Sequence, residues 1–191
     1  MELNIQDLCV RFSTPSGEIP AVNHVSLTVS PDTVTGIIGE TGSGKSVLGL
    51  SILGLLASNA AVTGHIFLGE RELTALSQRE LCQVRGRDIA LVAQNPATSL
   101  NPSLRVGRQI EEVFRLRGES RAECRAHTLE LLRSMAFSQP ERVARAYPFE
   151  LSGGMCQRAL TAIAVAARPR WIIADEPTKG LDAVVRNQVY D

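Results

Sequence analysis

A glycine-rich segment in the first quarter of the chain has residue types that bind phosphate. Its residues are Gly39, Glu40, Thr41, Gly42, Ser43, Gly44, Lys45 and Ser46, which fit the pattern G-x-x-x-x-G-K-[ST]. Glycines let the backbone curl so that successive N–H groups point at one phosphate, and the N-terminus of a following helix also favours an anion. In this chemistry Lys45 reaches the β- and γ-phosphates, and the Ser46 hydroxyl coordinates Mg²⁺. We call residues 39–46 the phosphate loop.

A second segment supplies carboxylates. Trp171–Ala174 is a mainly apolar run that predicts a buried strand, and Asp175 and Glu176 follow it directly. The carboxyl end of such a strand delivers side chains to the phosphates. Asp175 can then hold Mg²⁺ through its water shell, and Glu176 can orient and polarise the water that attacks the γ-phosphate. This pair favours an ATPase over a kinase, and the absence of an N-K-x-D motif disfavours a GTPase.

The elements that position these residues follow from apolar periodicity. Strands are predicted at Ile5–Phe12, Val25–Val29, Val34–Ile38, His65–Leu68 and Asp88–Val92. Helices are predicted at Ser46–Ala57, Val106–Gly118, Ser120–Ala136 and Met155–Ala167. Strands, then helices, then a strand again indicate an α/β nucleotide-binding core interrupted by a helical subdomain.

Composition excludes several classes of protein. The chain has 191 residues, 44% of them hydrophobic, and equal numbers of basic and acidic residues (20 each), so it is an ordinary globular sequence rather than a disordered one. The four cysteines are scattered without metal-ligand spacing, which predicts free thiols. Residues 47–63 carry no charge, but their apolar part is too short to span a membrane, so we expect a buried helix there; residues 1–10 do not have the pattern of a signal peptide.

Charge is uneven along the chain. Residues 79–145 contain 12 arginines and 8 acidic residues, a local excess of four positive charges. This excess predicts a solvated or partner-facing surface, with binding to a nucleic-acid phosphate backbone as the alternative.

The segment Leu151–Arg158, which reads LSGGMCQR, resembles the signature motif of the ATP-binding-cassette (ABC) ATPases. Gln94 resembles the Q-loop glutamine of this family, and Leu181-Asp182 resembles its D-loop. The resemblance covers the whole chain. Residues 99–102 (SLNP) and 175–178 (DEPT) are most similar to the subfamily that imports oligopeptides, dipeptides, nickel or metal-opine complexes. We call Leu151–Arg158 the signature segment.

The resemblance implies a role for several residues. Phe12 would stack on adenine, although it is also suited to an ordinary place in the core. Gln94 would contact Mg²⁺ and the attacking water and would report the nucleotide state to a membrane partner. Ser152, Gly153 and Gly154 would cap the γ-phosphate held by an opposite subunit, and Asp182 would lie at the dimer seam. Catalysis would then depend on Glu176, Gln94 and Lys45, and Mg²⁺ on Ser46, Gln94 and Asp175.

The resemblance also implies a fold and a biological setting. The fold would be α/β, a P-loop NTPase (RecA-like) core with an N-terminal antiparallel β subdomain and an inserted helical subdomain. Residues 1–191 would form one cassette, with its core at 1–94 and 160–191 and the helical subdomain at about 95–159. Its cofactors would be ATP and Mg²⁺. Its partners would be transmembrane permease subunits, a second ATPase subunit of the same or a related kind and, indirectly, a solute-binding protein. No nucleic acid is expected, and the chain would act at the cytoplasmic face of the cell membrane.

Two departures from the family pattern qualify this expectation. Cys156 stands where the subfamily commonly has a basic residue, which we expect to affect helix or partner contacts. The family places a further strand beside that of the phosphate loop, and then a switch histidine, after the D-loop, whereas this sequence ends at Asp191 and its three histidines precede Asp182. A truncated cassette that binds ATP without efficient hydrolysis is therefore one alternative. A soluble cassette acting in DNA repair or translation is another, but the sequence has one phosphate loop and no long insertion in 95–150.

Overall fold

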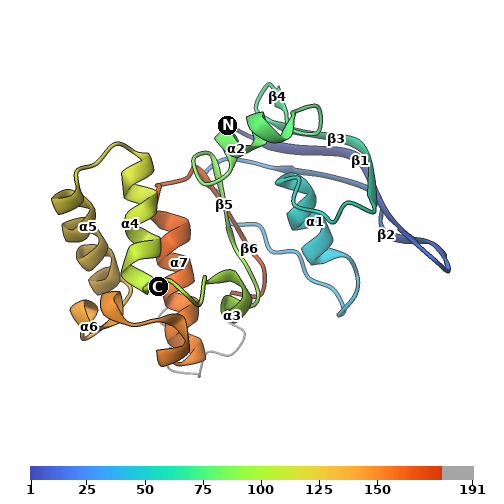
Figure 1. Ribbon diagram of the computed structural model, residues 1–191. Helices are drawn as coiled ribbons and strands as arrows, with labels where there is room; N and C mark the ends of the chain where they lie inside the picture. Colours follow the sequence, from blue (N-terminus) through green and yellow to red (C-terminus); the bar gives the residue numbers. More distant parts are fainter. Residues whose placement is uncertain (178–191) are drawn as a thin grey trace. The chain divides into compact units, whose positions relative to one another are not determined.

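The computed structural model describes residues 1–177 and divides the chain into two compact units, of which the first is Met1–Arg85 and the second begins at Gly86. The first unit contains a four-stranded antiparallel sheet in the order β2-β1-β3-β4 (Figure 1). The strands are β1 (Leu3–Thr14), β2 (Gly17–Val29), β3 (Ala60–Leu68) and β4 (Arg71–Glu72). The expected strands at Ile5–Phe12, Val25–Val29 and His65–Leu68 are confirmed as parts of longer ones.

A bulge on β1 changes which side chains are buried. Three steps along β1, from Ile5 to Leu8, oppose two steps along β2, from Leu27 to Val25. Asp7 takes a positive φ of 50° at this point, and a Cβ at Gly64 on β3 would collide with its carbonyl group. Glycine is therefore required opposite the bulge. The strict alternation of a strand is lost here, and Leu8, Cys9 and Val10 are all buried.

The helix after the phosphate loop is shorter than its sequence predicts. Helix α1 (Lys45–Ile52) ends just before Gly54, which takes a positive φ of 58°. The Arg85 side chain donates hydrogen bonds to the carbonyl oxygens of Leu53 (2.8 Å) and Gly54 (2.9 Å), at the C-terminal end of α1. Arg85 itself follows α2 (Gln78–Val84), a helix begun by a capping box between Ser77 and Glu80. This arginine thus satisfies carbonyl groups that the end of the helix leaves unpaired.

The predicted strand at Val34–Ile38 is wrong for this structure. Residues 33–40 have no regular secondary structure, and among the described residues no strand pairs with them. The side chains of Val34 and Ile38 are almost completely exposed, at 103% and 98%, and that of Ile37 is half exposed. A short apolar run becomes a buried strand only when neighbouring strands supply hydrogen bonds and cover its faces. No such neighbour is present in the described part of the chain.

The second unit combines a two-stranded parallel sheet with helices. Strand β5 (Ile89–Val92) pairs with β6 (Trp171–Ala174), with Ile89 opposite Trp171 and Val92 opposite Ala174. The helices are α3 (Pro96–Ser99), α4 (Val106–Leu116), α5 (Arg121–Ser134), α6 (Pro140–Arg145) and α7 (Gly153–Ala166), with a 3₁₀ turn at Pro148–Glu150. The expected helices at 106–118, 120–136 and 155–167 and the strands at 88–92 and 171–174 are confirmed. The domain boundaries drawn from the sequence, at residues 94 and 160, stay a prediction.

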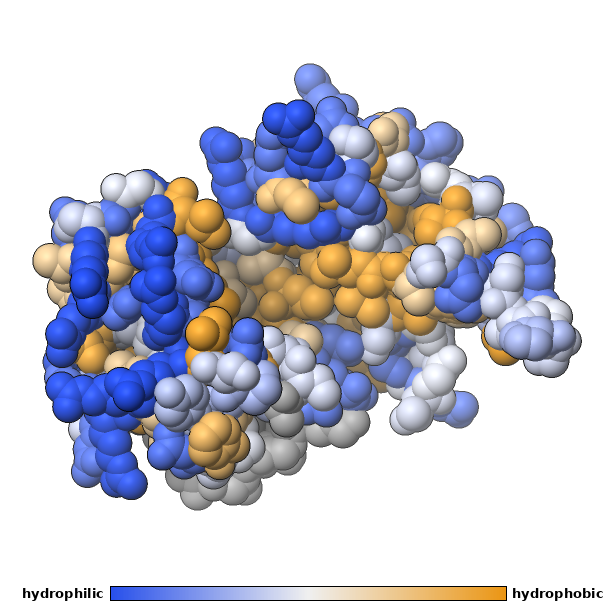
Figure 2. Space-filling view, viewed as in Figure 1, coloured by the Kyte–Doolittle hydropathy of each residue, from blue (hydrophilic) through white to orange (hydrophobic). Residues whose placement is uncertain are grey.

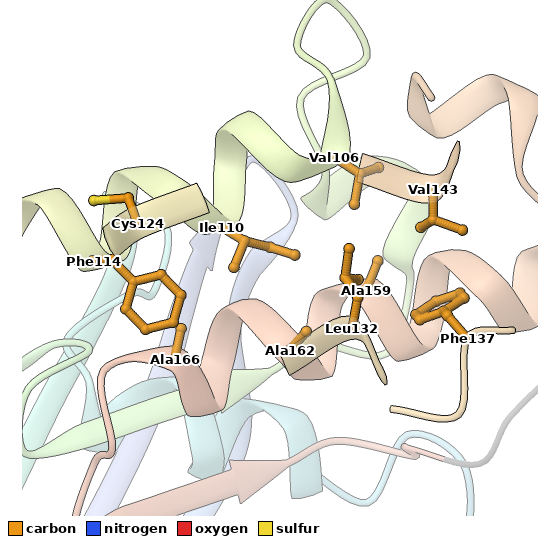
Figure 3. Packing of buried hydrophobic residues seen from close by; sticks show 10 residues of the cluster. All are labelled: Val106, Ile110, Phe114, Cys124, Leu132, Phe137, Val143, Ala159, Ala162 and Ala166. Atoms are coloured by element: carbon orange, nitrogen blue, oxygen red, sulfur yellow. The ribbon is translucent and has the colours of Figure 1, made fainter. Parts of the chain in front are cut away.

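The helices of the second unit share an apolar core (Figure 3). Its buried residues are Val106, Ile110, Phe114, Cys124, Leu132, Phe137, Val143, Ala159, Ala162 and Ala166. Small residues allow close approach, since a Cβ at Gly107 would lie 2.7 Å from the carbonyl oxygen of Ala144. Alanines on α7 act in the same way opposite the larger side chains of α4 and α5 (Figure 3).

Replacing Leu132 by alanine should lower the free energy of unfolding by about 2–5 kcal/mol, because Leu132 has no exposed surface and its removal leaves a cavity. Urea unfolding followed by circular dichroism measures the change. Leu116→Ala is the matched control, since Leu116 is 90% exposed and its truncation should change stability by less than about 0.5 kcal/mol. Equal losses in the two variants would contradict the assigned core.

Candidate functional site

The phosphate loop folds around the side chain of Lys45. The Lys45 ammonium donates to the carbonyl oxygens of Gly39 and Glu40, both at 2.7 Å, and lies 3.3 Å from the Ser43 hydroxyl oxygen. A turn closes the loop, with the Ser43 N–H donating to the Glu40 carbonyl at 3.2 Å. The loop therefore encircles a positive charge, and Glu40, Thr41, Gly42 and Ser43 are exposed.

The helix that follows the loop has an open N-terminus. Gly44 is its N-cap residue, with φ of 91°, and no side chain accepts a hydrogen bond from its first turn. A Cβ at Gly44 would collide with the carbonyl oxygen of Ala21 on β2, so only glycine fits. The first turn contains no acidic residue, and Ser46 lies in it. Uncapped N–H groups beside an ammonium fit a bound phosphate group.

In the second unit, the parallel pairing of β5 and β6 brings Gln94 and Glu176 together. The Asp175 N–H donates to the Val92 carbonyl at 2.9 Å, which continues the pairing beyond β6. Both strands therefore end at the same edge of the sheet, and the Gln94 side-chain amide (Nε2) donates to the Glu176 carboxylate (Oε2) at 2.5 Å. Glu176 has a positive φ of 47°, a conformation that L-residues other than glycine seldom adopt and that recurs at functional sites.

The signature segment forms the start of α7. Ser152 is the N-cap residue, and its hydroxyl oxygen accepts a hydrogen bond from the Met155 N–H at 3.3 Å. The first turn has no acidic residue, and Ser152 and Gly153 are exposed to solvent. This N-terminus, like that of α1, suits an anion.

Cys156 points into the protein rather than to a surface. It is buried with Leu100 and Leu160, and its thiol donates to the Pro148 carbonyl at 3.3 Å. Burial raises the pKa of the Cys156 thiol, which is therefore neutral at pH 7. The departure from the family pattern at this position thus affects the packing of α7.

The structure does not test the expected roles of two further residues of the site. Phe12 is half-buried on β1, opposite Ile19 and Ala60, and its stacking on adenine stays a prediction. Asp182 lies outside the described residues.

Some partners of the site residues were not anticipated from the sequence. The spacing of Ser152 and Met155 is that of an N-cap residue and the third helical residue, so this bond could have been found. The contact between Gln94 and Glu176 joins residues far apart in the sequence and depends on strand pairing. No sequence signal points to the carbonyl oxygens that hold Lys45.

Residues 1–177 contain no cluster of three or more histidine, cysteine or acidic side chains suited to a metal ion. Within the same residues, every helix is too short or too polar to cross a membrane.

Proteins of a known family are similar in sequence to nearly the whole chain. The ABC transporter family model matches residues 22–179. The oligopeptide transport ATP-binding protein OppD of Salmonella typhimurium is 41% identical over 188 residues, which cover 98% of this chain and 56% of that protein. The oligopeptide transport ATP-binding protein AppD of Bacillus subtilis is 38% identical over 192 residues, covering 99% of this chain and 58% of that protein. The chain thus spans somewhat more than half the length of these relatives.

A solved structure has the same fold. The dimeric structure of MJ0796, a bacterial ABC transporter cassette, matches with a TM-score of 0.87 and 29% identity, over 98% of this chain and 79% of that one. A second dimeric structure of that cassette, in a post-hydrolysis state bound to ADP and Pi, matches with a TM-score of 0.88. With the expected α/β cassette fold confirmed, the chain belongs to the ABC transporter family and carries its ATPase domain.

Proposed function

We propose that the chain binds and hydrolyses ATP and couples this reaction to the import of oligopeptides through transmembrane permease subunits. The observation that carries the catalytic part is the hydrogen bond between Gln94 and Glu176 at the end of β5 and β6. The names of the relatives, which are oligopeptide transport ATP-binding proteins, support the choice of solute class over nickel or dipeptide.

Different residues of the chain have different roles in the proposed reaction. The Glu176 carboxylate orients the attacking water and accepts its proton, and the bond from Gln94 fixes the position of that carboxylate. Lys45 binds the β- and γ-phosphates, and the uncapped first turn of α1 donates N–H groups to them. All of these proposed contacts are made with the phosphates of ATP, and none is made with the transported solute.

The proposed ligands of Mg²⁺ are Ser46, Gln94 and Asp175. Their hydroxyl, amide and carboxylate oxygens are the hard ligands that this cation prefers. Because Gln94 uses its Nε2 to donate to Glu176, its Oε1 is the atom that remains as a ligand. When bound, Mg²⁺ neutralises negative charge on the phosphates.

The second half of the proposal concerns assembly. The exposed N-terminus of α7 caps the γ-phosphate of ATP held by a second ATPase subunit, either another copy or a related chain, so that ATP drives dimerisation. The dimer then acts on permease subunits at the cytoplasmic face of the membrane. Recovery of permease subunits with the tagged chain from solubilised membranes separates this function from that of a soluble cassette.

Ser152→Arg tests the assembly. The arginine side chain would fill the exposed cap, so we expect ATP-dependent dimerisation to weaken at least about tenfold while ATP binding to the monomer is kept. Light scattering with and without MgATP measures dimerisation. Ser134→Arg, at an exposed position on α5, is the matched control. A normal ATP-dependent dimer of Ser152→Arg would contradict the role of the signature segment.

A further inference from the structure

We propose that a cavity among α4, α5 and α6 binds a compact polyanion that carries two or more phosphate groups. The cavity has a volume of about 380 Å³. Five arginines line it: Arg105, Arg108, Arg121, Arg125 and Arg145. Figure 2 shows strongly hydrophilic side chains gathered over the helices of the second unit. All the lining residues belong to that unit, whereas the phosphate loop belongs to the first.

Helical periodicity aligns one wall of the cavity. Arg121, Arg125 and Thr128 of α5 are spaced i, i+4 and i+7, so they lie along one face of that helix. Arg105 precedes the first turn of α4, and Arg145 ends α6. Positive side chains from all three helices therefore surround a single volume.

The two glutamates in the lining neutralise only part of the charge of these arginines. Glu111 pairs with Arg108 at 3.9 Å, and Glu141 pairs at 2.7 Å with Arg133, which is not in the lining. The side chains of Arg121, Arg125 and Arg145 form no ion pair or hydrogen bond with any part of the chain that the structure describes. Five arginines against two glutamates leave an excess of three positive charges, which attracts an anion.

One residue of the lining, Thr128, also has a buried hydroxyl without a partner within residues 1–177. Thr128 is only 1% exposed and lines the cavity, yet its Oγ1 has no hydrogen-bond partner among the described residues. A threonine in a helix commonly satisfies its hydroxyl on the carbonyl four residues earlier, which Thr128 does not do. An unsatisfied buried hydroxyl destabilises a fold, so a bound group that accepts this hydrogen bond would remove the cost.

The chemistry of the lining selects phosphate. Guanidinium groups bind phosphate oxygens through paired hydrogen bonds, and several of them together favour a ligand with more than one phosphate. The volume is at the lower end of the range for ligand pockets, which favours a compact group. Such a group is either a soluble polyphosphate or the head group of an anionic lipid.

Calorimetric titration with pyrophosphate tests the proposal in the 191-residue chain carrying Lys45→Ala, which removes the ammonium of the phosphate loop. We expect saturable binding at one site. Adding Arg121→Gln and Arg125→Gln together should weaken it at least about tenfold, and adding Thr128→Val alone should weaken it about tenfold, through loss of a hydrogen bond to an anion. The double change Arg115→Gln and Arg142→Gln, on exposed positions outside this cavity, removes the same charge and should leave binding unchanged.

Flotation with phosphatidylcholine vesicles, with and without cardiolipin, distinguishes the two sources of phosphate. Cardiolipin-dependent flotation that is lost in the Arg121/Arg125 variant supports a lipid head group, and pyrophosphate binding without flotation supports a soluble ligand. Circular dichroism confirms that each variant is folded, and Thr128→Val separates loss of the hydroxyl from loss of charge. Absence of both kinds of binding, or equal binding by the Arg121/Arg125 variant, would overturn the proposal.

Discussion

Glu176→Gln lowers the rate of ATP turnover by at least about a hundredfold and leaves the affinity for ATP unchanged. Glutamine has nearly the same shape as glutamate, so the contact with Gln94 at the edge of the sheet can still form. An amide cannot accept the proton of the attacking water, however, and the chemical step loses its base. The effect therefore falls on kcat rather than on binding.

Phosphate release under saturating MgATP measures turnover, and calorimetry measures the affinity of the same preparations. Glu130→Gln, on an exposed position of α5, is the matched control and should keep the original rate. If Glu176→Gln turns over ATP as fast as the unmodified chain, Glu176 is not the base.

Lys45→Ala weakens the binding of MgATP by about a hundredfold, which corresponds to roughly 3 kcal/mol of lost charge-assisted hydrogen bonding. The loop itself should keep its fold, because the Gly39 and Glu40 carbonyls that now bind the ammonium are exposed and can bind water instead. The variant thus separates the loss of a ligand contact from the loss of structure.

Isothermal titration calorimetry gives the affinity, and thermal unfolding checks that the variant is folded. Arg87→Ala removes an exposed positive charge outside the phosphate loop and should bind ATP normally. Unchanged binding by Lys45→Ala would mean that this segment is not the nucleotide site.

Patterns in the local sequence were sufficient to predict much of the fold. The apolar spacing of 106–118 and 120–136 predicted α4 and α5, because an amphipathic stripe is a property of the segment itself. The glycines and Lys45 of the phosphate loop were likewise recognisable from their spacing, and the structure shows an uncapped helix that begins at Lys45.

Features that depend on distant residues were not predictable in the same way. Val34–Ile38 has the composition of a buried strand, but strand formation needs a partner that its own residues cannot supply. The bulge at Asp7 and the contact between Gln94 and Glu176 likewise depend on pairing between separate strands. Helix α6 was missed because its six residues are too few to show a period.

The exposed run of residues 33–40 also affects solubility. Its backbone is unpaired with any described strand, and Val34 and Ile38 present apolar side chains to water. The formal net charge of the chain is zero at pH 7, and its isoelectric point is near 6.8, so no long-range repulsion keeps copies apart at neutral pH. We therefore expect the solubility of the chain to be lowest close to neutral pH and to rise on either side of it.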